Sequence, residues 1–133
     1  MRATNFTIDQ VKAAHARVRS GADFPAFIRE IKEMGIVSYE TYVVDGHTDY
    51  MGAENHQASS HTKYDPKVIA MAGNAEKLKS DLKSHQQGHS DYLTFCEQCA
   101  QSGVAKWAVS LEAMTCTYYD KKGGVILVEN IKV

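Results

Sequence analysis

Two cysteines in the stretch "YLTFCEQCA" have the spacing found in zinc sites and in redox dithiols. Redox dithiols place the first sulfur at a helix N-terminus, where the helix dipole stabilises a thiolate, but Cys96 follows the expected N-cap Asp91 by five residues. Zinc needs four ligands, and the chain has no second Cys-x-x-Cys motif. The sequence therefore favours packing cysteines without a metal, and metal binding or redox chemistry by Cys96 and Cys99 are the alternatives.

Polar side chains of a predicted β-hairpin form a second candidate site. The dipeptide Asp45-Gly46 separates "IVSYETYVV" from "HTDYM", and Asp-Gly between two such runs favours a two-residue type I′ turn. That turn pairs Tyr42 with Asp49 and directs four side chains to one face of the hairpin: Glu40, Tyr42, His47 and Asp49. Such a cluster can bind a small ligand or, with histidine as base, transfer a proton. The alternative is an ordinary solvated face of the sheet.

The remaining histidines give weaker patterns for chemistry. His85 and His89 lie in "HQQGH", which lacks the glutamate of a metalloprotease motif and is typical of a helix C-terminus. His56 and His61 follow the hairpin and could join His47 around a metal ion. We expect no cofactor from these patterns.

Capping signals predict where the first two helices begin and end. Thr7 and Gln10 form a capping box. Asp23 is the expected N-cap of the second helix, and Gly35 is the expected residue just after its end. The strands of the predicted hairpin follow.

The chain resembles itself when it is shifted by 68 residues. The shift places Cys96 and Cys99 at the positions of Ile28 and Ile31, where they complete the apolar stripe of a helix. It also aligns several capping, glycine and aromatic positions: Asp23 with Asp91, Phe24 with Tyr92, Phe27 with Phe95, Gly35 with Gly103, Tyr39 with Trp107, and Tyr50 with Tyr118. The alternative is chance similarity between two amphipathic patterns.

Each half of the chain therefore reads helix, helix, strand, strand, strand. We predict one α+β domain over residues 1–133, built by duplication, with repeat one at about 5–65 and repeat two at about 74–133. The sheet is expected to be mainly antiparallel, with the helices packed on one face. The shift also shows where the halves differ, because Glu40, Tyr42 and His47 align with Ala108, Ser110 and Thr115.

Composition restricts the function classes. The net charge of −1 gives no basic surface for nucleic acid. The first ten residues lack the apolar stretch of a signal peptide, and the longest aliphatic run, "VILV", is far shorter than a membrane span. We expect a soluble, cytoplasmic protein without membrane contact, whose three cysteines stay reduced.

Several unusual words occur in a fixed order along nearly the whole chain: "SGADFP", "YETYV-DGHT-Y", "HQQG", "YLTFC--CA--G", "KW" and "MTCTYYD". Through them the chain resembles the YbcV and YdfO type of small bacterial and prophage-borne proteins. The resemblance is weakest at residues 53–75. It implies an uncharacterised function and no assigned catalytic residue, although some members carry the name "phage envelope protein".

No set of nucleophile, base and orienting group is legible in the chain. We therefore predict a noncatalytic cytoplasmic module that binds a protein partner or a small ligand, with a homodimer through an exposed sheet edge as one form of partner. One alternative is a small enzyme or metal-binding protein with its site between the repeats or at Glu40, Tyr42 and His47. Another alternative, implied by the family label, is a phage structural component.

Overall fold

The computed structural model describes residues 6–18 and 23–131. The first half of the chain forms α1 (Ile8–His15), α2 (Phe24–Glu33), β1 (Ile36–Tyr42), β2 (Thr48–Gly52), the short 3-10 helix η2 (Ala53–Asn55) and β3 (Gln57–Ser59). The second half forms α3 (Ala75–Gln86), α4 (Tyr92–Gln101), β4 (Lys106–Ser110), β5 (Thr115–Tyr119) and β6 (Val125–Asn130).

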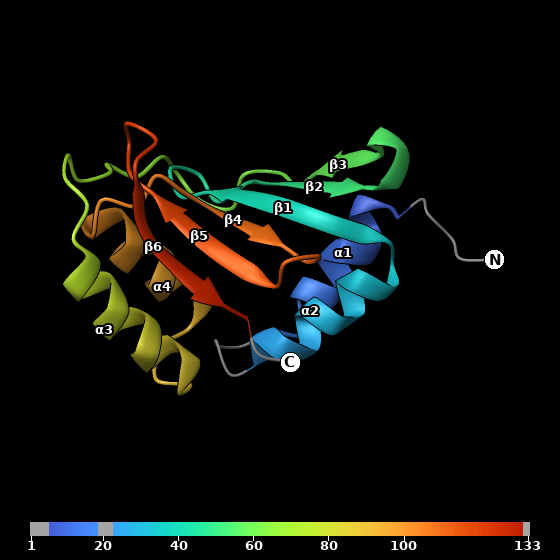
Figure 1. Ribbon diagram of the computed structural model, residues 1–133, viewed down its shortest axis with the longest axis horizontal. Coiled ribbons are helices and arrows are strands. Elements are labelled where there is room, and N and C mark those ends of the chain that lie inside the picture. Colours follow the sequence, from blue (N-terminus) through green and yellow to red (C-terminus); the bar gives the residue numbers. More distant parts are fainter. Residues whose placement is uncertain (1–5, 19–22, 132–133) are drawn as a thin grey trace.

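The six strands form one antiparallel sheet in the order β3-β2-β1-β4-β5-β6. Figure 1 shows both helix pairs on the same side of this sheet, α1 and α2 under one end and α3 and α4 under the other. Buried and less buried residues alternate along β4, β5 and β1 from Tyr39 onward, as expected for strands with one face on the core. The predicted α+β class, antiparallel sheet and one-sided helices are confirmed.

The two halves meet at the pairing of β1 with β4. Glu40 pairs with Ala108, which is its equivalent at the 68-residue offset. On either side, Tyr39 pairs with Val109 and Thr41 pairs with Trp107, and the offset converts each of these two pairs into the other. The halves are therefore related by an approximate two-fold axis through the middle of the sheet. The repeated order of elements agrees with the prediction, whereas an origin by duplication stays a prediction.

Most helix ends follow the expected capping chemistry. Asp23 is the N-cap residue of α2 as predicted, but its side chain makes no capping hydrogen bond to the helix. Thr7 and Gln10 make both hydrogen bonds of a capping box. The side chain of Asp91 accepts a hydrogen bond from the Thr94 backbone N–H at 2.8 Å. Gly35 follows α2 with a φ of 96°, a left-handed conformation in which a side chain would be strained.

The predicted two-residue turn at residues 45–46 is wrong. Thr41 pairs with Thr48, so the loop between β1 and β2 spans residues 43–47. Backbone N–H groups in the segment 63–67 donate to carbonyl oxygens of this loop, and the loop also bonds to the chain just before β4. These outside partners favour a wider loop than an isolated hairpin would adopt. The register moves by two residues, so every side chain keeps its predicted face.

The cysteines of the Cys-x-x-Cys motif lie in the core between the helices and the sheet. Cys96 and Cys99 are completely buried, like Ile28 and Ile31 at the equivalent positions of α2. Both sulfurs therefore serve as small apolar side chains in the packing of α4.

Candidate functional site

A pocket of about 380 Å³ lies between the two helix pairs, against the inner face of the sheet. Its lining residues come from both halves of the chain. Figure 1 shows α1–α2 and α3–α4 under opposite ends of the sheet, and residues of both pairs line the pocket. A pocket of this volume is in the range that proteins use for small molecules.

The floor of the pocket is made by the four central strands. Their alternate residues face the helices, and these form the floor: Tyr39, Thr41, Thr48, Tyr50, Trp107, Cys116 and Tyr118. The ring centroids of Tyr39 and Tyr50 are 5.4 Å apart, and those of Trp107 and Tyr118 are 6.2 Å apart. The two halves thus contribute matching aromatic pairs.

The walls continue the same correspondence. Phe27 of α2 meets Tyr39 at 6.4 Å between ring centroids, and Phe95 of α4 meets Trp107 at 5.8 Å. Five pairs of lining residues are related by the 68-residue offset: Phe24 and Tyr92, Phe27 and Phe95, Tyr39 and Trp107, Thr48 and Cys116, and Tyr50 and Tyr118. The pocket therefore lies on the approximate two-fold axis, and eight of its lining side chains are Phe, Tyr or Trp.

Two histidines break this symmetry. The N-caps Thr7 and Asn74 relate α1 to α3 by an offset of 67 residues. At this offset His15 is equivalent to Leu82, and Val18 is equivalent to His85. All four line the pocket. Each half therefore presents one imidazole where the other half presents an aliphatic side chain.

Both imidazoles are held in the neutral form. His15 contacts the ring of Tyr92 edge to face at 4.7 Å, which joins α1 to α4. Burial lowers the pKa of His15 to about 4, and the nearby ammonium of Lys63 contributes to this shift. Burial also lowers the pKa of His85, although hydrogen bonding to Ser90 opposes the shift.

The hydrogen bonds of His85 define its tautomer. Its Nδ1 lies 3.1 Å from both the backbone carbonyl oxygen and the hydroxyl of Ser90. A carbonyl oxygen only accepts, so Nδ1 carries the hydrogen and Nε2 is left as an acceptor. The ring is stacked on Phe95 with centroids 4.4 Å apart, which fixes its plane.

Four polar residues from α3 and the end of β6 form what we call the polar end of the pocket: His85, Gln86, Glu129 and Asn130. The Gln86 amide donates to the Glu129 carboxylate at 3.2 Å. Partial burial raises the pKa of Glu129, and the Gln86 hydrogen bond reduces that shift. Glu129 supplies the one carboxylate among the described lining residues, none of which is Lys or Arg.

The thiol and phenols of the floor stay protonated at neutral pH. Burial raises the pKa of Cys116 to about 12 and that of Tyr50 to about 12. Burial raises the pKa of Tyr39 and Tyr118 well above the ordinary phenol value. The floor is therefore aromatic and uncharged.

The residues predicted as a ligand site, Glu40, Tyr42, His47 and Asp49, lie on the opposite face of the sheet, and none of them lines the pocket. The Tyr42 hydroxyl donates to Glu40 at 3.1 Å, and Lys106 donates to the same carboxylate oxygen at 3.3 Å. The rings of Tyr42 and His47 are stacked with centroids 4.5 Å apart. Asp49 is the strand partner of Glu40, so the structure brings all four together on this face, and their role in binding stays a prediction.

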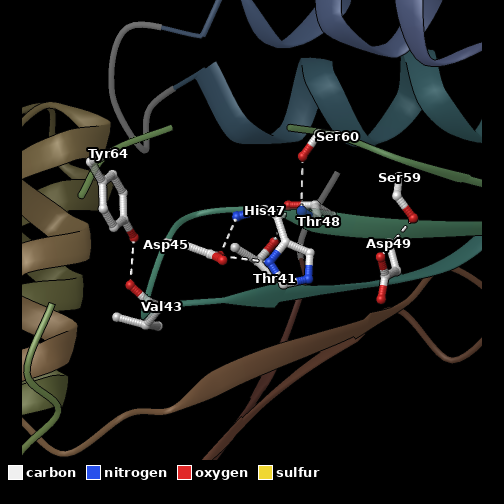
Figure 2. A network of polar contacts seen from close by, with 9 residues as sticks. All are labelled: Thr41, Val43, Asp45, His47, Thr48, Asp49, Ser59, Ser60 and Tyr64. Atoms are coloured by element: carbon white, nitrogen blue, oxygen red, sulfur yellow. Dashed lines mark hydrogen bonds and ion pairs between the residues drawn. The ribbon is translucent and has the colours of Figure 1, made fainter. Parts of the chain in front are cut away.

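Asp45 and Asp49 of this hairpin accept hydrogen bonds from neighbouring residues (Figure 2). Asp45 accepts hydrogen bonds from the backbone N–H of His47 at 3.0 Å and from its Nδ1 at 2.6 Å. Burial alone would raise the pKa of Asp45, but the hydrogen bonds from His47 outweigh it and lower the pKa. Asp49 accepts from Ser59 at 2.7 Å, which ties β2 to β3.

A network of hydrogen bonds joins the inner face of the hairpin to the chain that follows it and supports the pocket floor (Figure 2). The hydroxyls of Thr41 and Thr48 are 2.8 Å apart, and the Ser60 hydroxyl accepts from the Thr48 backbone N–H at 2.8 Å. The Tyr64 hydroxyl donates to the Val43 carbonyl oxygen at 2.7 Å. These bonds fix the strands β1 and β2 at the point where their inner faces meet the pocket.

Potential metal ligands are dispersed in the described part of the chain, and the thiols of the Cys-x-x-Cys motif are buried. Residues 6–18 and 23–131 contain no group of three or more His, Cys, Asp or Glu that could hold a metal ion. Burial raises the pKa of Cys96, and it raises that of Cys99 well above the ordinary thiol value. Thiols of this kind are poor nucleophiles and poor metal ligands.

The sequence indicated the space between the halves as one place for a site but did not reveal the residues of the polar end. His85 has the pattern of a helix terminus, and Glu129 and Asn130 carry no signal of their own. The signal that was present is the row of aromatic pairs at the 68-residue offset, since residues on an approximate axis between two halves converge.

Comparisons with known proteins place the chain in a family. No helix in the described residues has the length and apolar character needed to cross a membrane. A search of curated proteins finds no match. The narrower YbcV and YdfO assignment and the phage label stay predictions. A family profile described as "Protein of unknown function (DUF1398)" matches residues 12–130, and the chain therefore belongs to this uncharacterised family.

Proposed function

We propose that this protein is a noncatalytic binding module that holds a small, largely aromatic molecule in the pocket between its halves. The observation that carries the proposal is a pocket of about 380 Å³ lined by eight aromatic side chains from both halves. Such side chains give large contact areas at a low cost in conformational entropy, which suits a preformed site.

The protonation states of the lining groups favour binding over chemistry. The thiol of Cys116 and the phenols of Tyr39, Tyr50 and Tyr118 have raised pKa values, so none of them supplies an anionic nucleophile at neutral pH. The pocket holds these groups as neutral contacts.

The test uses N-phenyl-1-naphthylamine, an uncharged dye that fluoresces when it enters an apolar site. The full chain is titrated with the dye at pH 7. We expect saturable binding of one dye per chain and a rise in the melting temperature, because a ligand bound only to the folded state stabilises it by mass action.

Two variants locate the dye. Pro25, the second residue of α2, lines the pocket, whereas Leu93, the second residue of α4, is 55% exposed and does not line it. Pro25→Trp fills the pocket and is expected to weaken dye binding about ten-fold or more, while Leu93→Trp leaves it within about two-fold. Gln86→Trp, at the exposed end of α3, provides a second block at another point of the lining.

The proposal is overturned if the dye does not bind, or if Pro25→Trp and Gln86→Trp both retain the affinity of the parent chain. Circular dichroism and urea unfolding verify that each variant is folded before the titrations are compared.

A second candidate is ligand binding or proton transfer at the outer hairpin, favoured by the short contact between Asp45 and His47. A carboxylate that accepts from Nδ1 orients the imidazole and leaves Nε2 for a ligand. Titration of the chain with small carboxylic acids and amines, followed by the His47 ring signals in NMR, tests it. If no compound shifts those signals, this candidate is lost.

A further inference from the structure

We propose that the pocket selects an organic cation: an aromatic or other apolar body that carries an ammonium or amidinium group, with the charged group at the polar end. This inference rests on the proposed function, since it names the chemical class of the ligand in the same pocket.

The charges of the lining residues favour a cation. Among the described lining residues, Glu129 has the one acidic side chain, and no Lys or Arg is present. The two imidazoles are neutral at pH 7, because burial lowers the pKa of both His15 and His85. An anionic ligand would find no charged partner in this lining, whereas a cationic ligand would find the Glu129 carboxylate.

The aromatic walls favour a cation as well. The face of an aromatic ring carries partial negative charge and attracts cations, most strongly where water is excluded. Phe27 and Phe95 are 5% and 4% exposed, and Trp107 is 6% exposed, so a small part of each of these rings faces the pocket. Phe24 and Tyr92 are half-buried and present more of their rings. A cation with an apolar body gains from these rings both contact area and electrostatic attraction.

The polar end offers hydrogen-bond acceptors to a ligand and therefore favours a ligand that donates hydrogen bonds. The Nε2 atom of His85 is an acceptor, because Nδ1 carries the hydrogen toward Ser90. The Glu129 carboxylate also accepts, and one of its oxygens is already bonded to Gln86. An ammonium or amidinium group is rich in donors and matches these acceptors.

Among the described residues, Lys63 approaches the pocket wall from outside the lining. The ammonium of Lys63 lies 5.6 Å from the centroid of the Tyr92 ring, and burial lowers the pKa of Lys63. This charge is close to His15 and repels a second cation there. It therefore favours a ligand whose charged group lies at Glu129 and whose apolar body lies between the rings.

The test compares three ligands with the same naphthalene body at pH 7: 1-naphthylmethylammonium, 1-naphthylmethanol and 1-naphthoate. Isothermal titration calorimetry on the full chain measures each affinity. We expect the ammonium to bind about ten-fold more tightly than the alcohol, and the naphthoate to bind more weakly than both.

Glu129→Gln removes the charge while keeping the shape of the side chain. In this variant we expect the preference for the ammonium over the alcohol to fall to about two-fold or less, which is the part due to the rings, with the affinity of the alcohol changed by less than about two-fold. Glu112→Gln is the matched control, because Glu112 is exposed on the β4–β5 connection and does not line the pocket. It should leave all three affinities unchanged.

The outcomes separate this inference from the proposed function. If the alcohol or the naphthoate binds as tightly as the ammonium, cation selection is wrong while pocket binding stands. The same holds if Glu129→Gln retains the preference, or if the uncharged dye binds and none of the three ligands does. If neither the dye nor any of the three ligands binds, both proposals fail.

Discussion

The two halves of the molecule share a backbone plan but differ in the side chains that they present to the pocket. Equivalent aromatic residues, such as Tyr50 and Tyr118, form similar surfaces on the two sides of the approximate axis. The positions of His15 and Val18 are instead occupied by Leu82 and His85. Aromatic residues that the halves share therefore form most of the pocket, whereas residues that differ between the halves make its ends chemically different.

Removing the equivalent wall aromatics should have the largest effect. Phe27→Ala and Phe95→Ala each delete a buried ring, and we expect each to lower the free energy of unfolding by about 3–5 kcal/mol. Urea unfolding followed by circular dichroism measures both. A cost below about 1 kcal/mol for one variant beside a full cost for the other would show that the halves do not share the core equally.

Protonation of His15, which has no equivalent histidine in the second half, should make the free energy of unfolding depend on pH. Its pKa is about 4 in the folded chain and 6.5 for an unperturbed imidazole, so the unfolded chain binds more protons between these values. The stability from neutral His15 is complete above pH 6.5 and falls as the pH drops toward 4. We expect a loss on the order of 2 kcal/mol in that window, measured by urea unfolding at each pH.

The control for that prediction takes the residue of the other half. His15→Leu copies Leu82 and should remove the His15 part of the pH dependence, leaving the part due to His85, whose pKa is also lowered by burial. His89→Gln, at an exposed position after α3, should retain the whole pH dependence. Equal pH profiles for the parent chain and His15→Leu would refute the assignment.

The threonine pair in the pocket floor offers a smaller test. Thr41 and Thr48 share a buried hydrogen bond of 2.8 Å, whereas the equivalent positions in the other half hold Val109 and Cys116. Thr41→Val leaves the Thr48 hydroxyl with one fewer partner and should cost about 1–2 kcal/mol in unfolding free energy.

The double variant Thr41→Val with Thr48→Cys copies the other half at both positions. We expect it to recover most of the loss, because replacing both partners of a hydrogen bond by less polar groups of similar shape is nearly neutral. The same urea titrations report it. A double variant less stable than the single one would mean that the two halves are not interchangeable here.

The outer face should give the smallest effect. Lys106 contacts Glu40 at 3.3 Å, and both side chains are about one-third exposed. Glu40→Gln should change the unfolding free energy by less than about 1 kcal/mol and leave binding of N-phenyl-1-naphthylamine unchanged. If this substitution reduced the affinity for the dye, the binding site would lie on the outer face of the sheet and not in the pocket.

Local sequence signals predicted much of the framework. The capping box of Thr7 and Gln10 and the left-handed Gly35 depend on neighbouring residues, so the chain alone revealed them. The face of each hairpin residue was also predicted correctly, because the observed register differs from the predicted one by two residues and side chains alternate along a strand. The turn at residues 45–46 was not, since its geometry depends on hydrogen bonds from the distant segment 63–67.

The pocket lay beyond such local rules for a similar reason. It depends on the pairing of β1 with β4, which brings Tyr39 beside Val109 from the other half of the chain. Its polar end joins His85 and Gln86 of α3 to Glu129 at the end of β6. A shift of the sequence against itself aligned the aromatic pairs but could not show that they surround a space.

Intermolecular nuclear Overhauser effects from bound N-phenyl-1-naphthylamine test the central claim most directly. Thr48 and Trp107 lie on the pocket floor, and Tyr42 lies on the outer face of the same sheet. We predict effects from the dye to the Thr48 methyl group and the Trp107 indole, and none to the Tyr42 ring. Effects to Tyr42 without any to Thr48 or Trp107 would contradict binding in the pocket.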